Sequence, residues 1–286
     1  MSKIILVTGA STGFGYDTAQ TLASSGHTVF ASMRDPQGKN REHAEALREK
    51  EIQVVALDVT SNDSVNSGVS NVLAKAGRID VLINNAGIAS AGVSEAFTDE
   101  QVTSLFDVNV IGLHRVTKAV LPTFRNQGDG LIINIGSILG RVTFPFFGIY
   151  GASKYAVEAM TDSLRYETSQ FGLDVSLIQP SAYPTNMYAS VLQPKDADTI
   201  EEYGEIGQIP NAMFGSFMEM FEAADGPDAH DVAKAIVGLV DTPKGKRPAR
   251  TVVGTSFGAD DLNKVIAPVQ SSVIKALGLE YLDDAI

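Results

Sequence analysis

The sequence predicts an α/β fold in which helices cover both faces of a parallel, doubly wound, seven-stranded sheet. Short apolar runs alternate with helical patterns along almost the whole chain, which is typical of strands joined by crossover helices. The runs are apolar throughout rather than at every second residue, as expected for strands buried on both faces. A glycine-rich turn joins the first apolar run to the first helical pattern.

Each element follows from its own pattern. The predicted strands are 4–7, 28–32, 52–57, 81–83, 131–135, 175–178 and 249–253. The predicted helices run from Gly15 to Gly26, Asn40 to Lys50, Ser61 to about Ala76, Thr98 to about Leu121, Gly151 to about Phe171, Ala229 to Val240, and Asp260 to Leu277. Ser61 and Thr98 are suitable N-capping residues for two of these helices.

We expect residues 1–286 to form one domain. Between residues 183 and 228 the periodicity fades, and acidic residues mix with Met and Phe. A segment of this length between elements is usually a functional lid or disordered. The apolar side chains favour a substrate lid after the sixth strand, and residues 256–286 form a C-terminal extension.

Composition narrows the function classes. The net charge of -12 argues against nucleic acid or an anionic membrane as a partner. The chain has no cysteine, and its four histidines are scattered, so thiolate chemistry is excluded and no metal site is predicted. The four-residue apolar run near the start is too short for the core of a signal peptide, and no run reaches the roughly 18 residues needed to cross a bilayer. We therefore expect a cytoplasmic protein.

The turn after the first strand has the pattern of a dinucleotide-binding site. Gly9 permits a tight turn, Gly13 lets a pyrophosphate approach the backbone, and Gly15 lets the helix pack on the sheet. Exposed N–H groups at the start of the helix then hold the phosphates. The residues predicted to form this part of the cofactor site are Gly9, Ser11, Thr12, Gly13, Phe14 and Gly15.

The end of the second strand bears on the choice between NADP(H) and NAD(H). NAD sites usually place an acidic residue about 20 positions beyond the glycines, where this chain has Met33. Arg34 follows and suits a ribose 2′-phosphate, so we predict a preference for NADP(H). Asp35 leaves NAD(H) open as an alternative.

Two further strand ends complete the predicted cofactor site. Asp58 and Val59 follow the third strand, where the carboxylate would accept from the adenine amino group. Asn85, Ala86 and Gly87 follow the fourth strand, where small residues suit contact with a ribose or with the central sheet.

Tyr150, Lys154 and Ser137 are the candidate catalytic residues. An offset of four places Tyr150 and Lys154 on the same face of a helix. An ammonium beside the phenol stabilises the phenolate and would lower the pKa of Tyr150 from its usual value of about 10. Ser137 follows a buried strand, so its hydroxyl lies at the strand's carboxyl end. The three side chains would hold a carbonyl oxygen and transfer a proton to it.

Taken together, these motifs resemble those of the short-chain dehydrogenase/reductase family, in its compact single-domain branch with a Rossmann fold. The resemblance covers residues 3 to 255 and rests on residues in the family's order: Thr8 to Gly15, Asp58, Asn84 to Gly87, Asn109, Ser137, Tyr150 and Lys154. It departs from the family's pattern where Ser181, in place of glycine, follows Pro180. Many NADP-preferring members also carry a basic residue inside the glycine motif, where this chain has the neutral Ser11 and Thr12.

The resemblance implies a role for each matching residue. Tyr150 would be the acid in carbonyl reduction and the base in alcohol oxidation, and Lys154 would hold the nicotinamide ribose. Asn109 would steady a water that links Lys154 to solvent. Thr185 would hold the carboxamide, and Pro180 would lie beside the nicotinamide.

The predicted function is therefore interconversion of a small hydrophobic ketone and its secondary alcohol by a nicotinamide-dependent oxidoreductase. Two alternatives remain: an enzyme resembling sugar-nucleotide epimerases and dehydratases, and a nucleotide-sensing protein without turnover. The glycine spacing speaks against the first, and the presence of Tyr150, Lys154 and Ser137 against the second. Small residues along the helix after Gly151 suit packing on a second subunit, so we expect a homodimer or homotetramer.

Overall fold

The computed structural model describes residues 2–283 and contains one parallel sheet. Its strands are β1 (Ile4–Val7), β2 (Thr28–Met33), β3 (Gln53–Ala56), β4 (Val81–Asn84), β5 (Gly130–Ile135), β6 (Leu173–Pro180) and β7 (Arg250–Val253). The seven strands are hydrogen-bonded in the order β3-β2-β1-β4-β5-β6-β7, and every pair is parallel. The predicted α/β fold is confirmed, with each strand within a few residues of its expected place.

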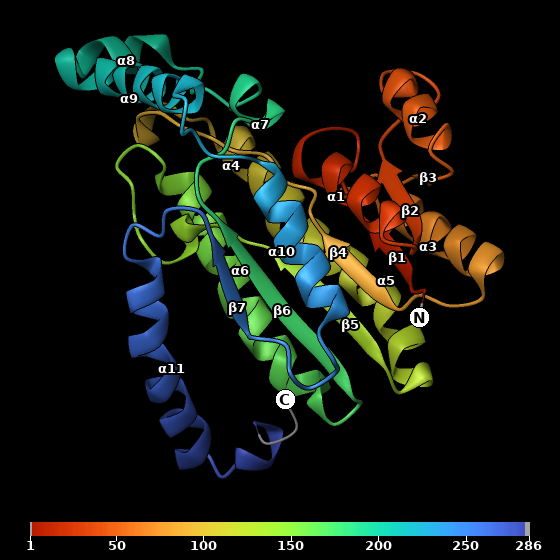
Figure 1. The fold of residues 1–286 in the computed structure, drawn as a ribbon. Helices are drawn as coiled ribbons and strands as arrows, with labels where there is room; N and C mark the ends of the chain where they lie inside the picture. The colour runs from red at the N-terminus through yellow and green to blue at the C-terminus, as the bar shows by residue number, and fades with distance from the viewer. Residues whose placement is uncertain (1, 284–286) are drawn as a thin grey trace.

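The strand order reverses direction between β1 and β4, near the middle of the sheet (Figure 1). Connections from β1 lead outward toward β3, whereas those from β4 lead outward toward β7. At such a switch point the loops after the two central strands separate and leave a crevice for ligands. The glycine turn after β1 and the Asn85 segment after β4 both lie at the carboxyl ends of these two neighbouring strands.

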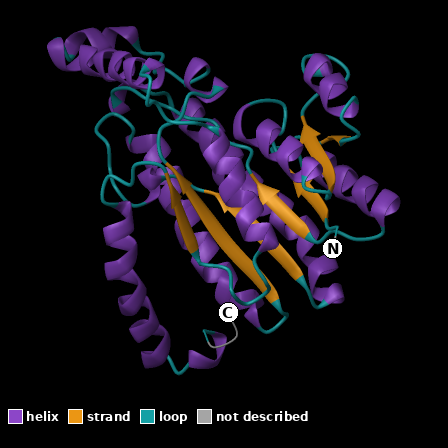
Figure 2. Cartoon of the chain, in the orientation of Figure 1, coloured by secondary structure: helices purple, strands orange, loops and turns teal. Residues whose placement is uncertain are grey.

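Helices cover both faces of the sheet (Figures 1 and 2). One face is packed against α1 (Gly13–Ser24), α2 (Arg41–Arg48) and α10 (His230–Asp241). The other is packed against α3 (Asn62–Ala76), α5 (Leu113–Gln127) and α6 (Gly148–Ser169). The strand side chains alternate between two apolar clusters, one on each side of the sheet, so that Ile5 and Leu6 enter different clusters.

The helix predicted from Thr98 is interrupted near its middle. It consists of α4 (Asp99–Phe106), a π-helical stretch over Asp107–Gly112, and α5, which ends before Gly128 in the left-handed region. Such π stretches often occur at functional sites, because the wider turn redirects a side chain. Here the stretch contains Asn109, which is buried.

The segment after β6 is more regular than its faded periodicity predicts. It forms α7 (Asn186–Ala189), α8 (Ala197–Glu202) and α9 (Glu205–Glu222). The helical pattern is obscured because α9 is mostly exposed, with Gly207 its one buried residue, and because Pro210 lies within it. In Figure 1, α8 and α9 project from one end of the molecule.

After β7 the chain forms α11 (Ala259–Ala276), which runs back along the side of the sheet (Figure 1), and then a 3₁₀ turn, Glu280–Leu282. Its outer face exposes Val265, Val269 and Leu277. Across residues 2–283, none of the helices combines the length and the apolar character needed to cross a membrane.

Candidate active site

The glycine turn between β1 and α1 has the geometry of a phosphate cradle. Gly9 and Gly13 adopt left-handed backbone angles, with φ of 65° and 57°. A Cβ on Gly9 would lie 2.8 Å from Ala86 Cα, and one on Gly15 would lie 2.6 Å from the Gly9 carbonyl oxygen. Only glycine therefore lets the turn pack this tightly. Thr12, the N-cap of α1, makes no capping hydrogen bond with its side chain, which leaves the first amides of α1 for a phosphate.

Asn85 holds this turn in place. Its side-chain amide donates to the carbonyl oxygens of Thr8, at 2.9 Å, and Gly9, at 3.1 Å. The Thr8 hydroxyl in turn accepts from the backbone amides of Asn85 and Ala86. The predicted Asn85 site residue thus lies at the crevice, where its side chain braces the glycine turn. The segment therefore has a structural role, which the sequence allowed alongside contact with a ribose.

Arg34 directly follows β2. Its side chain is exposed, and it has no ion pair with any residue between 2 and 283. Asp35, by contrast, has a φ of 44°, and its carboxylate accepts from the amides of Gly38 at 3.0 Å and Lys39 at 2.8 Å. These contacts occupy both oxygens of Asp35 in the following turn, whereas the Arg34 guanidinium keeps its donors.

Asp58 and Val59 lie at the end of β3, as predicted. One Asp58 carboxylate oxygen, Oδ1, accepts from the amide and the hydroxyl of Thr60. The other oxygen, Oδ2, has no hydrogen-bond partner among residues 2–283 and would suit an amino group of a ligand. The Val59 carbonyl accepts from Arg115, which fixes this loop against α5.

The three candidate catalytic residues are buried close together. Ser137 follows β5, its backbone is extended, and its hydroxyl accepts from the Leu139 amide at 3.1 Å. Tyr150 and Lys154 lie in the first two turns of α6. The Lys154 Nζ donates to the Ile135 carbonyl oxygen at 2.9 Å and lies 5.6 Å from the centre of the Tyr150 ring.

Burial controls the proton affinities of this group. It raises the pKa of Tyr150 to about 12, although the neighbouring Ser137 hydroxyl acts in the opposite direction. It lowers the pKa of Lys154 from 10.5 to about 8. The sequence led us to expect a lowered pKa for Tyr150. Removal of the phenol from water raises this pKa instead, so the Tyr150 phenol keeps its proton at neutral pH.

Asn109 is held by backbone contacts on the opposite side of Lys154. Its side chain accepts from the Ile88 amide at 2.9 Å and donates to the Ile88 carbonyl and to Ser153 Oγ at 2.8 and 3.0 Å. Gly87 lies between the two side chains, because a Cβ there would be 3.3 Å from Asn109 Oδ1 and 3.9 Å from Lys154 Nζ. Asn109 and Lys154 therefore both lie close to Gly87, and the role of Asn109 in holding a water stays a prediction.

Ser137, Tyr150 and Lys154 open into an apolar pocket of about 850 Å³, including the solvent at its mouth. Phe14 lies at the cofactor side of this pocket, with its ring centre 5.7 Å from that of Tyr183. Pro180 and Thr185, predicted on the nicotinamide side, also line it. The remaining walls come from the aromatic loop after β5, from α7 and α9, and from the loop after β7: Phe144, Phe147, Met187, Tyr188, Val191, Phe217 and Phe257.

Two pocket residues, Tyr188 and Phe257, were not singled out from the sequence. Tyr188 lies in the short helix α7, and its ring centre is 4.9 Å from that of Phe221 and 6.0 Å from that of Phe217. Phe257 follows β7, and the centre of its ring lies 5.3 Å from that of Phe144. Neither has a spacing signal, because each reaches the pocket through a loop or single turn whose path depends on the folded sheet.

Comparison with known proteins identifies the chain. The family model described as short chain dehydrogenase matches residues 3–196. The chain belongs to the short-chain dehydrogenase family. Members of this family bind a nicotinamide dinucleotide, and the glycine cradle, the free amides of α1 and the adjoining apolar pocket fit such a group.

Two relatives and one solved structure illustrate this similarity. A 3-ketodihydrosphingosine reductase of Bacteroides thetaiotaomicron is 40% identical over 183 residues, which cover 64% of this chain and 65% of that protein. Human 17-beta-hydroxysteroid dehydrogenase type 1 is 32% identical over 249 residues, covering 84% of this chain and 75% of that protein. The structure of a variant actinorhodin polyketide ketoreductase with NADPH has a TM-score of 0.74 and 27% identity, covering 90% of this chain and 97% of that one.

Proposed function

We propose that this protein is an oxidoreductase that interconverts a hydrophobic ketone and its secondary alcohol, with NADP(H) preferred over NAD(H). The observation that carries the proposal is the position of the Tyr150 phenol, buried beside Ser137 and Lys154 at the wall of an apolar pocket. The similarity to a 3-ketodihydrosphingosine reductase and to a 17-beta-hydroxysteroid dehydrogenase supports an apolar substrate.

The protein's own residues supply the proton transfer. A substrate carbonyl oxygen in the pocket would accept from the Tyr150 and Ser137 hydroxyls, which hold it in one orientation. Because the pKa of Tyr150 is about 12, the phenol carries the proton that the new alcohol needs. The Lys154 ammonium then stabilises the phenolate that remains. A bound nicotinamide supplies the hydride.

The walls of the pocket describe the substrate further. Phe144, Phe147, Phe217 and Phe257 offer apolar surface for a chain or ring system. The Tyr188 hydroxyl has no hydrogen-bond partner within residues 2–283, and burial raises the pKa of this phenol. It therefore remains a neutral donor, suited to a second oxygen on the substrate. We propose a ketone that carries another oxygen away from the reacting carbonyl.

Arg34 carries the proposed cofactor preference. It is exposed at the end of β2 with its donors free, and Asp35 is occupied by the Gly38 and Lys39 amides. A ribose 2′-phosphate would find a guanidinium and no competing carboxylate oxygen. The neutral Ser11 and Thr12 leave Arg34 as the main basis for this preference.

We further propose one catalytic domain over the whole chain, with residues 183–228 as the lid. Exposed apolar side chains on α6 and α11, among them Tyr155 and Val265, support assembly into a homodimer or homotetramer. A cytoplasmic location stays a prediction from the sequence.

The test is turnover with NADPH and NADH against a panel of acyl, aryl and steroid ketones, followed at the nicotinamide absorbance. Tyr150→Phe, which removes the proton donor with little change in shape, should reduce kcat by about 10²- to 10⁴-fold and keep cofactor affinity. Near-normal turnover in that variant would overturn the mechanism. Cofactor binding without turnover of any ketone by the wild-type protein would favour a nucleotide-sensing role instead.

A further inference from the structure

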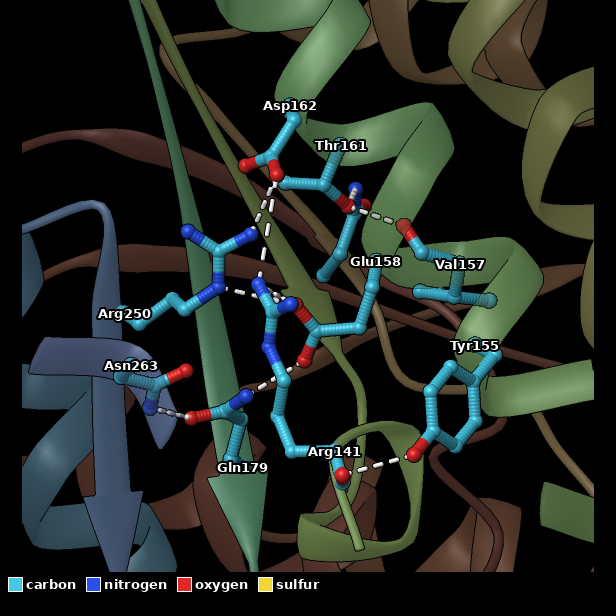
Figure 3. A network of polar contacts seen from close by, with 10 residues as sticks. Arg141, Tyr155, Val157, Glu158, Thr161, Asp162, Gln179, Arg250 and Asn263 are labelled. Carbon is cyan, nitrogen blue, oxygen red and sulfur yellow. Dashed lines mark hydrogen bonds and ion pairs between the residues drawn. The ribbon is translucent and has the colours of Figure 1, made fainter. Parts of the chain in front are cut away.

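A buried ion-pair network joins α6, the turn after β5 and the strands β6 and β7 (Figure 3). At its centre is Glu158 of α6, whose side chain is 4% exposed. One carboxylate oxygen, Oε2, lies 2.9 Å from Arg141 Nη2 and 2.8 Å from Arg250 Nε. The other, Oε1, accepts from the side-chain amide of Gln179. Arg250 also pairs with Asp162, one turn further along α6, at 2.5 Å.

The partners of Glu158 are all hydrogen-bond donors, so this position requires an acceptor on both oxygens. A buried carboxylate meets that requirement, whereas an amide would turn its NH₂ group toward one donor. Burial raises the pKa of Glu158, against the opposing effect of Arg250 and Arg141, so the charged form depends on these two partners.

Two partners of Glu158, Arg141 and Gln179, belong to segments that bear part of the candidate active site. Ser137 is the N-cap and Arg141 the C-cap of the 3₁₀ turn Ile138–Gly140. Gln179 is the penultimate residue of β6 and precedes Pro180 of the pocket wall. Glu158 itself lies one helical turn beyond Lys154. The network thus joins the serine-bearing turn, the end of β6 and the tyrosine-bearing helix.

Packing at Gly140 shows how closely the turn and α6 are joined. A Cβ on Gly140 would lie 2.9 Å from Glu158 Cγ and 3.0 Å from the Lys154 carbonyl oxygen. On the same side, the Tyr155 hydroxyl donates to the Arg141 carbonyl oxygen at 2.6 Å. Three contacts therefore hold the turn on α6: the packing of Gly140, the Tyr155 hydrogen bond and the ion pair between Arg141 and Glu158. Helix α11 also joins the network, because Asn263 donates to Gln179 Oε1 at 2.7 Å.

We propose that Glu158 is a positioning residue for the reaction: by binding Arg141 and Gln179 it fixes Ser137 and the end of β6 relative to Tyr150 and Lys154. This inference rests on the proposed function, because Ser137 and Tyr150 must share one substrate oxygen. Small displacements between such groups are costly, since a misplacement of about 1 Å can reduce a rate roughly hundredfold. The family's catalytic residues alone would then be insufficient for full activity.

The test compares two buried carboxylates on or beside the same strand. Glu158→Gln breaks the network at the carboxyl end of β6. The control is Asp174→Asn at the amino end of β6, where Asp174 also pairs with an arginine, Arg247, and accepts from the Gly245 amide at 3.0 Å. We expect Glu158→Gln to reduce kcat about ten- to hundredfold with cofactor affinity within about threefold of wild type. Asp174→Asn should keep wild-type kcat despite a comparable loss of thermal stability.

A second variant and a second measurement keep the inference testable if Glu158→Gln does not fold. Arg141→Met leaves Glu158 paired with Arg250 and Gln179 and removes the side-chain ion pairs that join the turn to Glu158 and Asp162, so it should lower kcat in the same way. Hydrogen exchange should be faster at Gly140, Arg141 and Val142, whose amides donate within the turn, in both variants and not in Asp174→Asn.

The exchange measurement needs no substrate, so it separates the two proposals. Absence of turnover in wild type counts against the proposed function, while exchange still tests the coupling. Wild-type kcat in Glu158→Gln or Arg141→Met, or an equal loss of kcat in Asp174→Asn, would overturn the positioning role. Unchanged exchange in the turn would overturn it as well.

Discussion

At the scale of single residues, the site depends on side chains whose surroundings change their chemistry. The same burial that keeps the Tyr150 phenol protonated lowers the pKa of Lys154, so the ammonium loses its proton more easily. Two requirements on Lys154 oppose each other. The lysine must be charged to stabilise the phenolate, but a buried ammonium is costly. The single hydrogen bond from Lys154 to the Ile135 carbonyl offsets part of that cost.

This opposition predicts how Lys154 affects stability with pH. The pKa of Lys154 is 10.5 in the unfolded chain and about 8 in the folded protein. Between these values the unfolded chain binds more protons at this site, so the contribution of Lys154 to the free energy of unfolding rises with pH. Below about pH 8 the buried ammonium is destabilising. The stability of Lys154→Met relative to wild type should therefore fall as the pH rises from about 7 to 10.

Urea unfolding of both proteins across that range measures the effect. Lys118→Met, in which an exposed lysine of α5 is replaced, is the control for general effects of removing a charge. A difference between Lys154→Met and wild type that stays constant with pH would show that burial does not shift this lysine.

Other residues show where sequence reasoning was sufficient and where it failed. The glycine turn after β1 follows from a local requirement, because Gly9 and Gly13 have left-handed backbone angles and Gly9 and Gly15 leave no room for a Cβ. The orientation of Asp35 and the network around Glu158 were not predictable in this way. The first depends on a left-handed backbone angle at Asp35, and the second joins residues up to 92 positions apart.

At the scale of elements, strands and core helices follow their sequence patterns, and the lid does not. The central strands are predictable because each is buried on both faces and is therefore largely apolar. Helix α9 carries Phe214, Phe217 and Phe221 on the side that meets α7, and exposes Ile206 and Met218 elsewhere. Apolar side chains on more than one side give no clear period, so a helix was not expected there.

The contacts of the proposed lid, residues 183–228, predict which part of it would open. Its first part is fixed to the body, because the Leu192 amide donates to Ala89 at 2.9 Å and the Gln101 side chain donates to Gln193 at 2.8 Å. Helix α9 has far less support, since its one buried residue is Gly207. We expect limited proteolysis to cut first between residues 203 and 228, and to slow when NADP⁺ and an apolar ketone are bound.

Phe217→Ala provides the matched variant for this experiment. The centre of the Phe217 ring lies 6.2 Å from that of Phe147 in the body of the protein. Loss of this ring should speed cleavage of α9. It should lower the melting temperature of the whole protein by no more than a few degrees. Equal cleavage with and without ligands, or first cleavage before residue 197, would show that α9 does not close over the pocket.

At the scale of the whole molecule, charge works against the cofactor that we propose. The net charge of -12 repels a dinucleotide, and the 2′-phosphate of NADP adds up to two further negative charges. Long-range electrostatics alone would therefore favour NAD. A preference for NADP requires a local cation whose contact is short enough to outweigh this repulsion, which salt screens over about 8 Å at physiological ionic strength.

Arg34 is the residue that we expect to supply this contact, and its replacement tests the preference. A charge-assisted hydrogen bond to phosphate contributes about 1.5–3 kcal/mol, which corresponds to roughly ten- to hundredfold in affinity. Arg34→Ala should lower kcat/KM for NADPH by that factor and leave the value for NADH nearly unchanged. Arg41→Ala is the matched control, because Arg41 is exposed nearby on α2 but pairs with Glu45 at 3.1 Å. Without Arg34 the acidic surface is unopposed, so added salt should improve NADPH binding more in Arg34→Ala than in wild type. A wild-type preference for NADH, or a cofactor ratio that Arg34→Ala leaves unchanged, would show that the 2′-phosphate is not recognised at this strand end.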